Sequence, residues 1–180
     1  MNALAPAPVL VLAVGNPSRG DDGLGPAVAA RLEAAAVPGV EVIEDFQLQV
    51  EHALDLAGRR RVVFVDAGVG TRAPYELGPV RPRGEVLHTS HALAPGAVLE
   101  TWVRLHGTAP PEAWVLCIRG ESFGLGEGLS GRASRHLEVA WPALLALVQN
   151  RVADAPEGCP ETQPGAPKEC NFVNYVNGLK

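Results

Sequence analysis

Four apolar runs of strand length, separated by helical patterns, constrain the fold of this 180-residue chain most strongly. The runs span residues 9–15, 40–45, 61–68 and 113–120. They are almost continuous in Val, Leu, Ile and Ala, which is typical of parallel strands buried on both faces. Helical patterns lie between them at residues 24–36, 48–58 and about 95–107. This alternation predicts an α/β fold: a single domain with a twisted, mainly parallel sheet flanked by helices on both faces.

The remaining segments set the limits of this domain. A last helix is expected over residues 132–151, with a kink or break in the middle because Pro142 lies inside it. The segment 75–89, YELGPVRPRGEVLHT, is expected to form a hairpin or short edge strands, since its prolines exclude a central strand. We predict a domain over residues 1–152 and a flexible extension over 153–180, which is rich in proline, glycine and polar residues.

Composition excludes several classes of function. The net charge of -5 argues against nucleic acid as the main partner. No apolar run approaches the roughly 18 residues that span a bilayer, and the N-terminus lacks the basic start of a signal peptide. We therefore expect a cytoplasmic protein without a membrane partner. The three cysteines are odd in number and lack metal-type spacing, so neither a disulfide framework nor a zinc knuckle is indicated.

Acidic residues lie at or just beyond the ends of the first three strands. Asp21 and Asp22 come just after the first strand, Asp45 ends the second and Asp66 lies in the third. Ligands in open α/β sheets bind at the carboxyl ends of the strands, so these side chains are expected near one another. Carboxylates held together are costly unless a cation or protons lie between them. A cation site is the simplest explanation.

A histidine would complete such a site. His91 opens the segment HALAPG, from which a ligand can face the end of the sheet, whereas His88 is assigned to the edge-strand run. Two carboxylates and one imidazole suit a borderline divalent ion such as Ni²⁺ or Zn²⁺ and leave coordination positions open.

Other interpretations of the same residues remain. An aspartate before a helix can cap it, which is the main alternative for Asp21, and Asp66 can form an Asx turn. A nucleotide-binding module would also use a strand, a glycine-rich turn and a helix. However, lysine occurs only at Lys168 and Lys180, and two aspartates in the turn would repel a pyrophosphate.

Four motifs occur in order along the chain: GNPSRGDDGLG (15–25), VVFVDAG (62–68), HTSHALAPG (88–96) and ESFGLGEGLS (121–130). Together they resemble those of the hydrogenase maturation endopeptidases, which remove a C-terminal peptide from the large subunit of [NiFe] hydrogenases. The resemblance covers residues 8 to 150. The segment 45–68, DFQLQVEHALDLAGRRRVVFVDAG, is more specifically similar to the member that serves soluble, NAD-reducing hydrogenases.

The resemblance implies a ligand set, a metal and a partner. The family's metal-binding positions fall on Asp22, Asp66 and His91. The implied ion is Ni²⁺ supplied by the substrate, with Zn²⁺ or another divalent ion as a substitute, and the implied partner is the hydrogenase large-subunit precursor. Asp45 is the candidate catalytic residue, orienting a water molecule or the scissile peptide; its alternative role is to cap a helix starting near Gln47. The alternative function is a non-proteolytic nickel-binding chaperone of hydrogenase assembly.

Overall fold

A five-stranded sheet forms the centre of the protein. The computed structural model describes residues 6–83 and 93–150. The strands are β1 (Val9–Val14), β2 (Val40–Asp45), β3 (Arg61–Gly68), β4 (Tyr75–Pro79) and β5 (Glu112–Arg119). Their order is β2-β1-β3-β5-β4, and all neighbouring pairs are parallel except β4 and β5. The predicted mainly parallel sheet is confirmed, and β4 is an edge strand, as its proline content requires.

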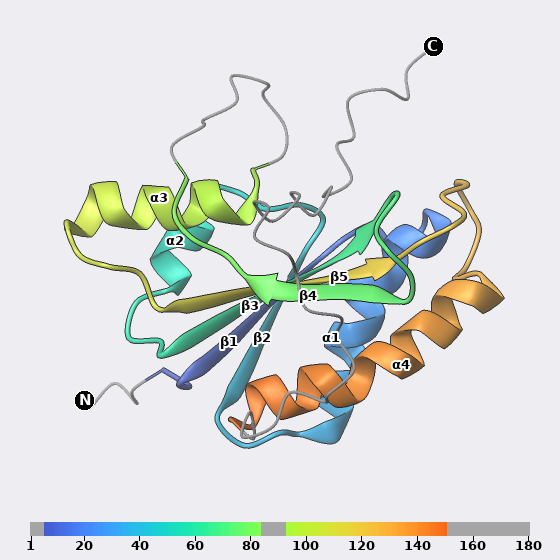
Figure 1. Cartoon of the computed structure of the whole chain (residues 1–180), viewed down its shortest axis with the longest axis horizontal. Coiled ribbons are helices and arrows are strands. Elements are labelled where there is room, and N and C mark those ends of the chain that lie inside the picture. Colours follow the sequence, from blue (N-terminus) through green and yellow to red (C-terminus); the bar gives the residue numbers. More distant parts are fainter. Residues whose placement is uncertain (1–5, 84–92, 151–180) are drawn as a thin grey trace, which may run out of the picture.

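Helices cover both faces of this sheet. They are α1 (Leu24–Ala35), α2 (His52–Asp55), α3 (Pro95–His106) and α4 (Gly131–Val148), with a 3-10 turn, η1 (Gly20–Gly23), before α1. α1 and α4 pack on one face, and α2 and α3 on the other (Figure 1). The predicted fold class is thus confirmed. Within the described ranges, no helix combines the length and apolar character needed to cross a membrane.

The central strands are buried on both faces. In β3, Val62 and Phe64 belong to the layer under α2 and α3, while Val63 and Val65 belong to the layer under α1 and α4. All four are completely buried. This explains why the strand shows an unbroken apolar run rather than alternation. Because successive side chains point to opposite faces, Asp66 shares the face of Val62 and Phe64.

Two helix predictions need correction. The helix expected over residues 48–58 is only the single turn α2. Around it the backbone makes tighter bonds between residues three apart, such as the one from the N–H of Ala53 to the carbonyl of Val50. In contrast, α4 continues unbroken through Pro142. Apolar side chains before and after this proline are buried in the same layer, which compensates for one missing helical hydrogen bond.

The turn after β1 brings the acidic residues to the carboxyl edge of the sheet. Gly15 has a φ of +144°, which favours glycine, and its N–H donates to the carbonyl of Asp45 at 3.0 Å. A Cβ at Gly15 would also collide with the carbonyl oxygen of Asp22. The glycine therefore allows η1 to fold back over the ends of β1 and β3.

Candidate active site

Asp22 and Asp66 form a buried acidic pair at the carboxyl edge of the sheet. Asp22 lies in η1 and is 2% exposed, and its Oδ2 accepts the N–H of Asn16 at 2.8 Å. Asp66 is 7% exposed, and its Oδ1 accepts the N–H of Ala67 at 2.7 Å. Burial raises the pKa of Asp66 well above its usual value, and the charges of Cys117 and Asp22 raise it further. Ionising Asp66 is thus unfavourable in the metal-free protein.

This pair has the chemistry of a cation site, since a positive charge would offset the cost of holding two buried carboxylates together. The third predicted ligand, His91, lies outside the described residues, as does His88. Among residues 6–83 and 93–150, no group of three His, Cys, Asp or Glu side chains could hold a metal ion. The ligand set therefore remains a prediction.

The described residues resume at Leu93, which lies on the same face of the sheet as Asp66. Leu93, two residues after His91, donates its N–H to the carbonyl of Leu48 at 3.3 Å. Both leucines belong to the apolar layer under α2 and α3.

Asp45 lies at the same level of the sheet as Asp66. It ends β2 and is paired with Val14 of β1, while Ala13 is paired with Val65 of β3. Asp66, the next residue of β3, is therefore level with Val14. Two strand spacings separate Asp45 from Asp66, or about 10 Å between their backbones.

The carboxylate of Asp45 is held by its own loop. Its Oδ1 accepts the N–H of Phe46 at 2.6 Å, and its Oδ2 lies 3.4 Å from Nε2 of Gln49. The same oxygen is 3.5 Å from Nε2 of His52. Because α2 has no side-chain cap, the helix-cap interpretation of Asp45 is wrong. The catalytic interpretation remains a prediction.

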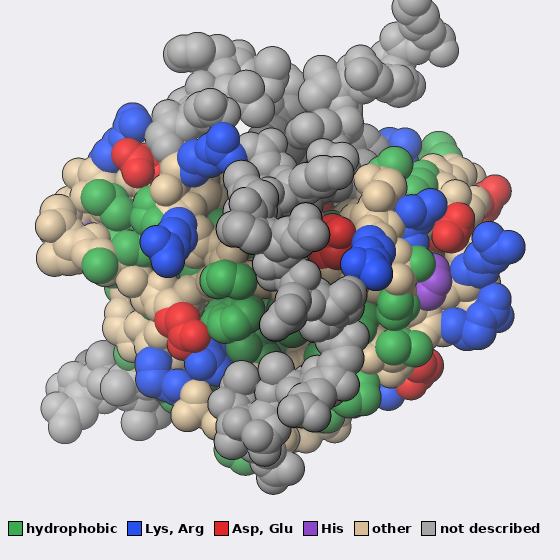
Figure 2. Space-filling model, in the orientation of Figure 1, with side chains coloured by type: hydrophobic (Ala, Val, Ile, Leu, Met, Phe, Trp, Pro, Cys, Tyr) green, Lys and Arg blue, Asp and Glu red, His purple; other side chains and the backbone are tan. Residues whose placement is uncertain are grey.

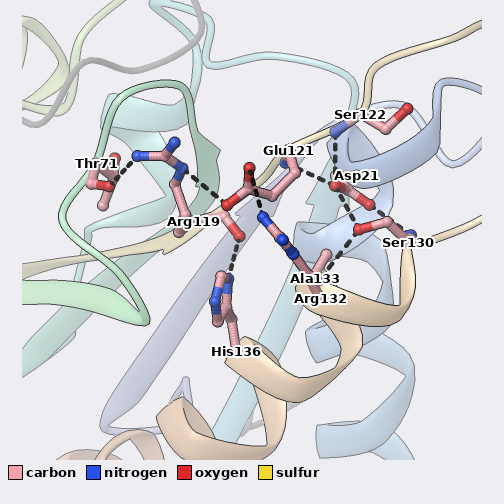
Figure 3. A network of polar contacts seen from close by, with 9 residues as sticks. All are labelled: Asp21, Thr71, Arg119, Glu121, Ser122, Ser130, Arg132, Ala133 and His136. Carbon is pink, nitrogen blue, oxygen red and sulfur yellow. Dashed lines mark hydrogen bonds and ion pairs between the residues drawn. The ribbon is translucent and has the colours of Figure 1, made fainter.

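Asp21 has a different role from its neighbour. Its Oδ2 accepts the N–H groups of Glu121 and Ser122 and the hydroxyl of Ser130, and its Oδ1 accepts the N–H of Ser130 (Figure 3). These four distances lie between 2.6 and 2.9 Å. Burial alone would raise the pKa of Asp21, but these hydrogen bonds outweigh it and lower the pKa. Asp21 does not cap the helix that follows it, so that interpretation is wrong.

The backbone of residues 120–130 is joined to the same turn. The N–H of Gly20 donates to Glu127 at 3.0 Å, and that of Asp21 donates to Ser122 at 2.7 Å. Ser130 then begins α4 by accepting the N–H of Ala133. Asp21 therefore connects the turn that carries Asp22 to the start of a helix more than 100 residues later.

A group of charged side chains lies beside this connection. Glu121 is 3.5 Å from Nε of Arg119 and 3.9 Å from Nη1 of Arg132, and His136 contacts the carbonyl of Arg119 at 2.8 Å. His136 therefore has a structural contact, joining α4 to the end of β5. Figure 2 shows arginine side chains gathered at the end of the molecule where α4 begins. Cys117 is fully buried within β5 and contacts Thr71, in agreement with an inert thiol.

The fold is that of the hydrogenase maturation proteases. No family model matches the chain, and no curated protein matches it. Among solved structures, the hydrogenase maturating endopeptidase HybD from E. coli is 25% identical, with a TM-score of 0.62. The match covers 80% of this chain and 93% of HybD.

Two archaeal structures have the same fold. The [NiFe] hydrogenase maturation protease HycI from Thermococcus kodakarensis KOD1 is 23% identical, with a TM-score of 0.61 and coverage of 82% of this chain and 96% of HycI. The HybD protease from Thermococcus kodakarensis is 22% identical, with a TM-score of 0.57 and coverage of 78% and 98%. These structures are named as endopeptidases or proteases, in agreement with the enzyme class that the sequence motifs imply.

Proposed function

We propose that this protein is an endopeptidase that removes the C-terminal peptide of a [NiFe] hydrogenase large-subunit precursor after nickel insertion. The observation that carries the proposal is the buried pair of Asp22 and Asp66, whose carboxylates repel each other at the carboxyl edge of the sheet. The named activities of the structures with the same fold support it. The segment 45–68 favours an NAD-reducing hydrogenase as the substrate. The proposed compartment is the cytoplasm.

In this proposal Asp22, Asp66 and His91 engage the nickel that the precursor carries. The two aspartates supply negative oxygen ligands from a largely dry site, and the imidazole adds nitrogen. A divalent ion bound there would polarise the scissile carbonyl and activate a water molecule. Asp45, about two strand spacings from Asp66, is left to contact the peptide chain.

The activity is tested by intact mass spectrometry of the purified cognate precursor, incubated with the protein after nickel loading and, separately, without nickel. The expected result is loss of one C-terminal fragment from the loaded precursor only. Cleavage of both samples would refute recognition of nickel. No cleavage of a loaded precursor that another preparation can process would favour the nickel-binding chaperone instead.

The ligand set is tested by calorimetric titration of the protein with Ni²⁺ and with Zn²⁺. Asp22→Asn, Asp66→Asn and His91→Ala should each weaken binding at least tenfold, because each removes one of only three protein ligands. Glu33→Gln is the matched control, since Glu33 is an exposed carboxylate on α1. Unchanged binding by His91→Ala would remove this histidine from the proposed set.

A further inference from the structure

The geometry around His52 defines which of its ring nitrogens carries a proton. His52 is 6% exposed, and its Nδ1 accepts the N–H of Gln49 at 2.9 Å. A nitrogen that accepts a hydrogen bond carries no proton, so the proton of the neutral ring is on Nε2. This nitrogen is the one that faces the carboxylate of Asp45 at 3.5 Å. The loop thus fixes the tautomer of His52 and places its protonated nitrogen beside the carboxylate of Asp45.

This contact leaves Asp45 oriented but accessible. The side chain of Asp45 is 31% exposed, whereas that of His52 is 8% exposed. Donors from Phe46, Gln49 and His52 surround the carboxylate on the side of its own loop. Each carboxylate oxygen can accept more than one hydrogen bond, so Asp45 keeps acceptor capacity toward solvent.

The position of Asp45 favours contact with a peptide over contact with the metal. Its backbone is about 10 Å from that of Asp66 across the sheet. The carboxylate of Asp45 is held within its own loop, whereas Asp66 is close enough to Asp22 for the charge of Asp22 to raise its pKa. An extended peptide rises about 3.3 Å per residue, so about three residues would connect the two positions.

The same loop presents apolar side chains to solvent. Phe46 is 69% exposed, Val50 48% and Leu54 61%. Phe46 directly follows Asp45, and Leu54 lies in the helical turn that also carries His52. These exposed apolar side chains, close together in sequence, are available to contact a partner. An extended peptide offers backbone N–H groups, from which Asp45 can accept a hydrogen bond. It also offers side chains that can pack against these exposed apolar residues.

We infer that His52 is a positioning residue, which holds the carboxylate of Asp45 so that it accepts a backbone N–H of the precursor's C-terminal peptide about three residues from the scissile bond. This inference rests on the proposed endopeptidase function. It separates Asp45 from the metal ligands: Asp45 would place the peptide, and His52 would act only through Asp45.

Two substitutions of His52 separate its two contacts. An asparagine oxygen can occupy the place of Nδ1 and accept the N–H of Gln49, but it leaves nothing near Nε2. A glutamine nitrogen reaches the place of Nε2 and can still donate to Asp45. Processing of the nickel-loaded precursor should show KM raised about tenfold in His52→Asn with kcat within twofold, and mostly restored in His52→Gln. His106→Asn, at an exposed histidine of α3, is the matched control.

A double-mutant cycle and NMR complete the test. In an Asp45→Asn background, His52→Asn should have little further effect, because the two residues act as one unit. The ¹⁵N chemical shifts of the wild-type ring should show a proton on Nε2 and none on Nδ1. Wild-type KM in His52→Asn, additive effects in the cycle, or a proton on Nδ1 would each overturn the inference. Failure of the wild-type protein to cleave the loaded precursor would instead overturn the proposed function and the inference that depends on it.

Discussion

Replacing Asp21 by asparagine tests the connection between the site and α4 most directly. The amide keeps one acceptor oxygen, which can serve the three donors that now bond to Oδ2. Its NH₂ group then faces the N–H of Ser130, which loses its 2.6 Å bond. An unpaired buried donor costs about 1–3 kcal/mol, and the other three bonds lose the strength that a charged acceptor gives them. We expect a loss of about 3 kcal/mol, or about 6–12 °C in Tm for a protein of this size.

The assay is thermal denaturation followed by circular dichroism, with Asp55→Asn as the matched control. The carboxylate of Asp55 makes no hydrogen bond within the described residues, so its substitution should leave Tm nearly unchanged.

The pH dependence provides a second criterion. Since the pKa of Asp21 is lowered in the fold, its stabilising effect is complete above the unfolded value of about 3.9 and is lost as pH falls through the folded value. The difference in Tm between wild type and Asp21→Asn should be full at pH 7 and shrink below about pH 4. A Tm within 2 °C of wild type at pH 7, or a difference that grows in acid, would refute the reasoning.

Two further substitutions test the turn and the acidic pair. Gly20→Ala should lower Tm far more than Gly70→Ala: both glycines have positive φ, but only at Gly20 would a Cβ lie 2.5 Å from the carbonyl oxygen of Ser122. Similar losses in the two variants would contradict this account of the turn. Asp66→Asn should raise the Tm of the metal-free protein at pH 7, because the raised pKa makes the ionised carboxylate unfavourable in the fold. This gain in Tm should fade as the pH falls and wild-type Asp66 becomes protonated. A Tm of Asp66→Asn below that of wild type at neutral pH would contradict this prediction.

Most of the fold could be predicted because its main signals are local. The central strands β1, β3 and β5 are mostly apolar runs, and α1 and α3 each end within about a residue of the predicted boundary. The segment 48–58 misled the prediction because its apolar residues have helical spacing. Side chains in that loop bond to backbone N–H groups: Asp45 binds that of Phe46, and His52 binds that of Gln49. Such bonds offer the backbone an alternative to a longer helix.

Only the residues at the ends of the strands could be predicted to lie close together. Asp22 and Asp66 could be brought together from sequence because both follow the general rule for ligand sites in open sheets. The partners of Asp21 could not be predicted from sequence. Glu121 and Ser130 lie 100 and 109 residues away, and nothing near Asp21 indicates them. The role of His52 cannot be predicted from sequence either, because only its contact with Asp45 in the fold distinguishes it from the other histidines.

The two adjacent aspartates therefore differ in what surrounds them. Asp21 is buried among four donors, which favour its charge, so it is satisfied by the protein itself. Asp22 instead raises the pKa of Asp66 through its charge, an effect that a proton or a cation between the two carboxylates would offset. Loss of Asp21 should consequently weaken folding and processing together, because it releases the turn. Loss of Asp22 should abolish processing while the protein stays folded, because in the proposed site Asp22 is a ligand and does not make the connection to α4.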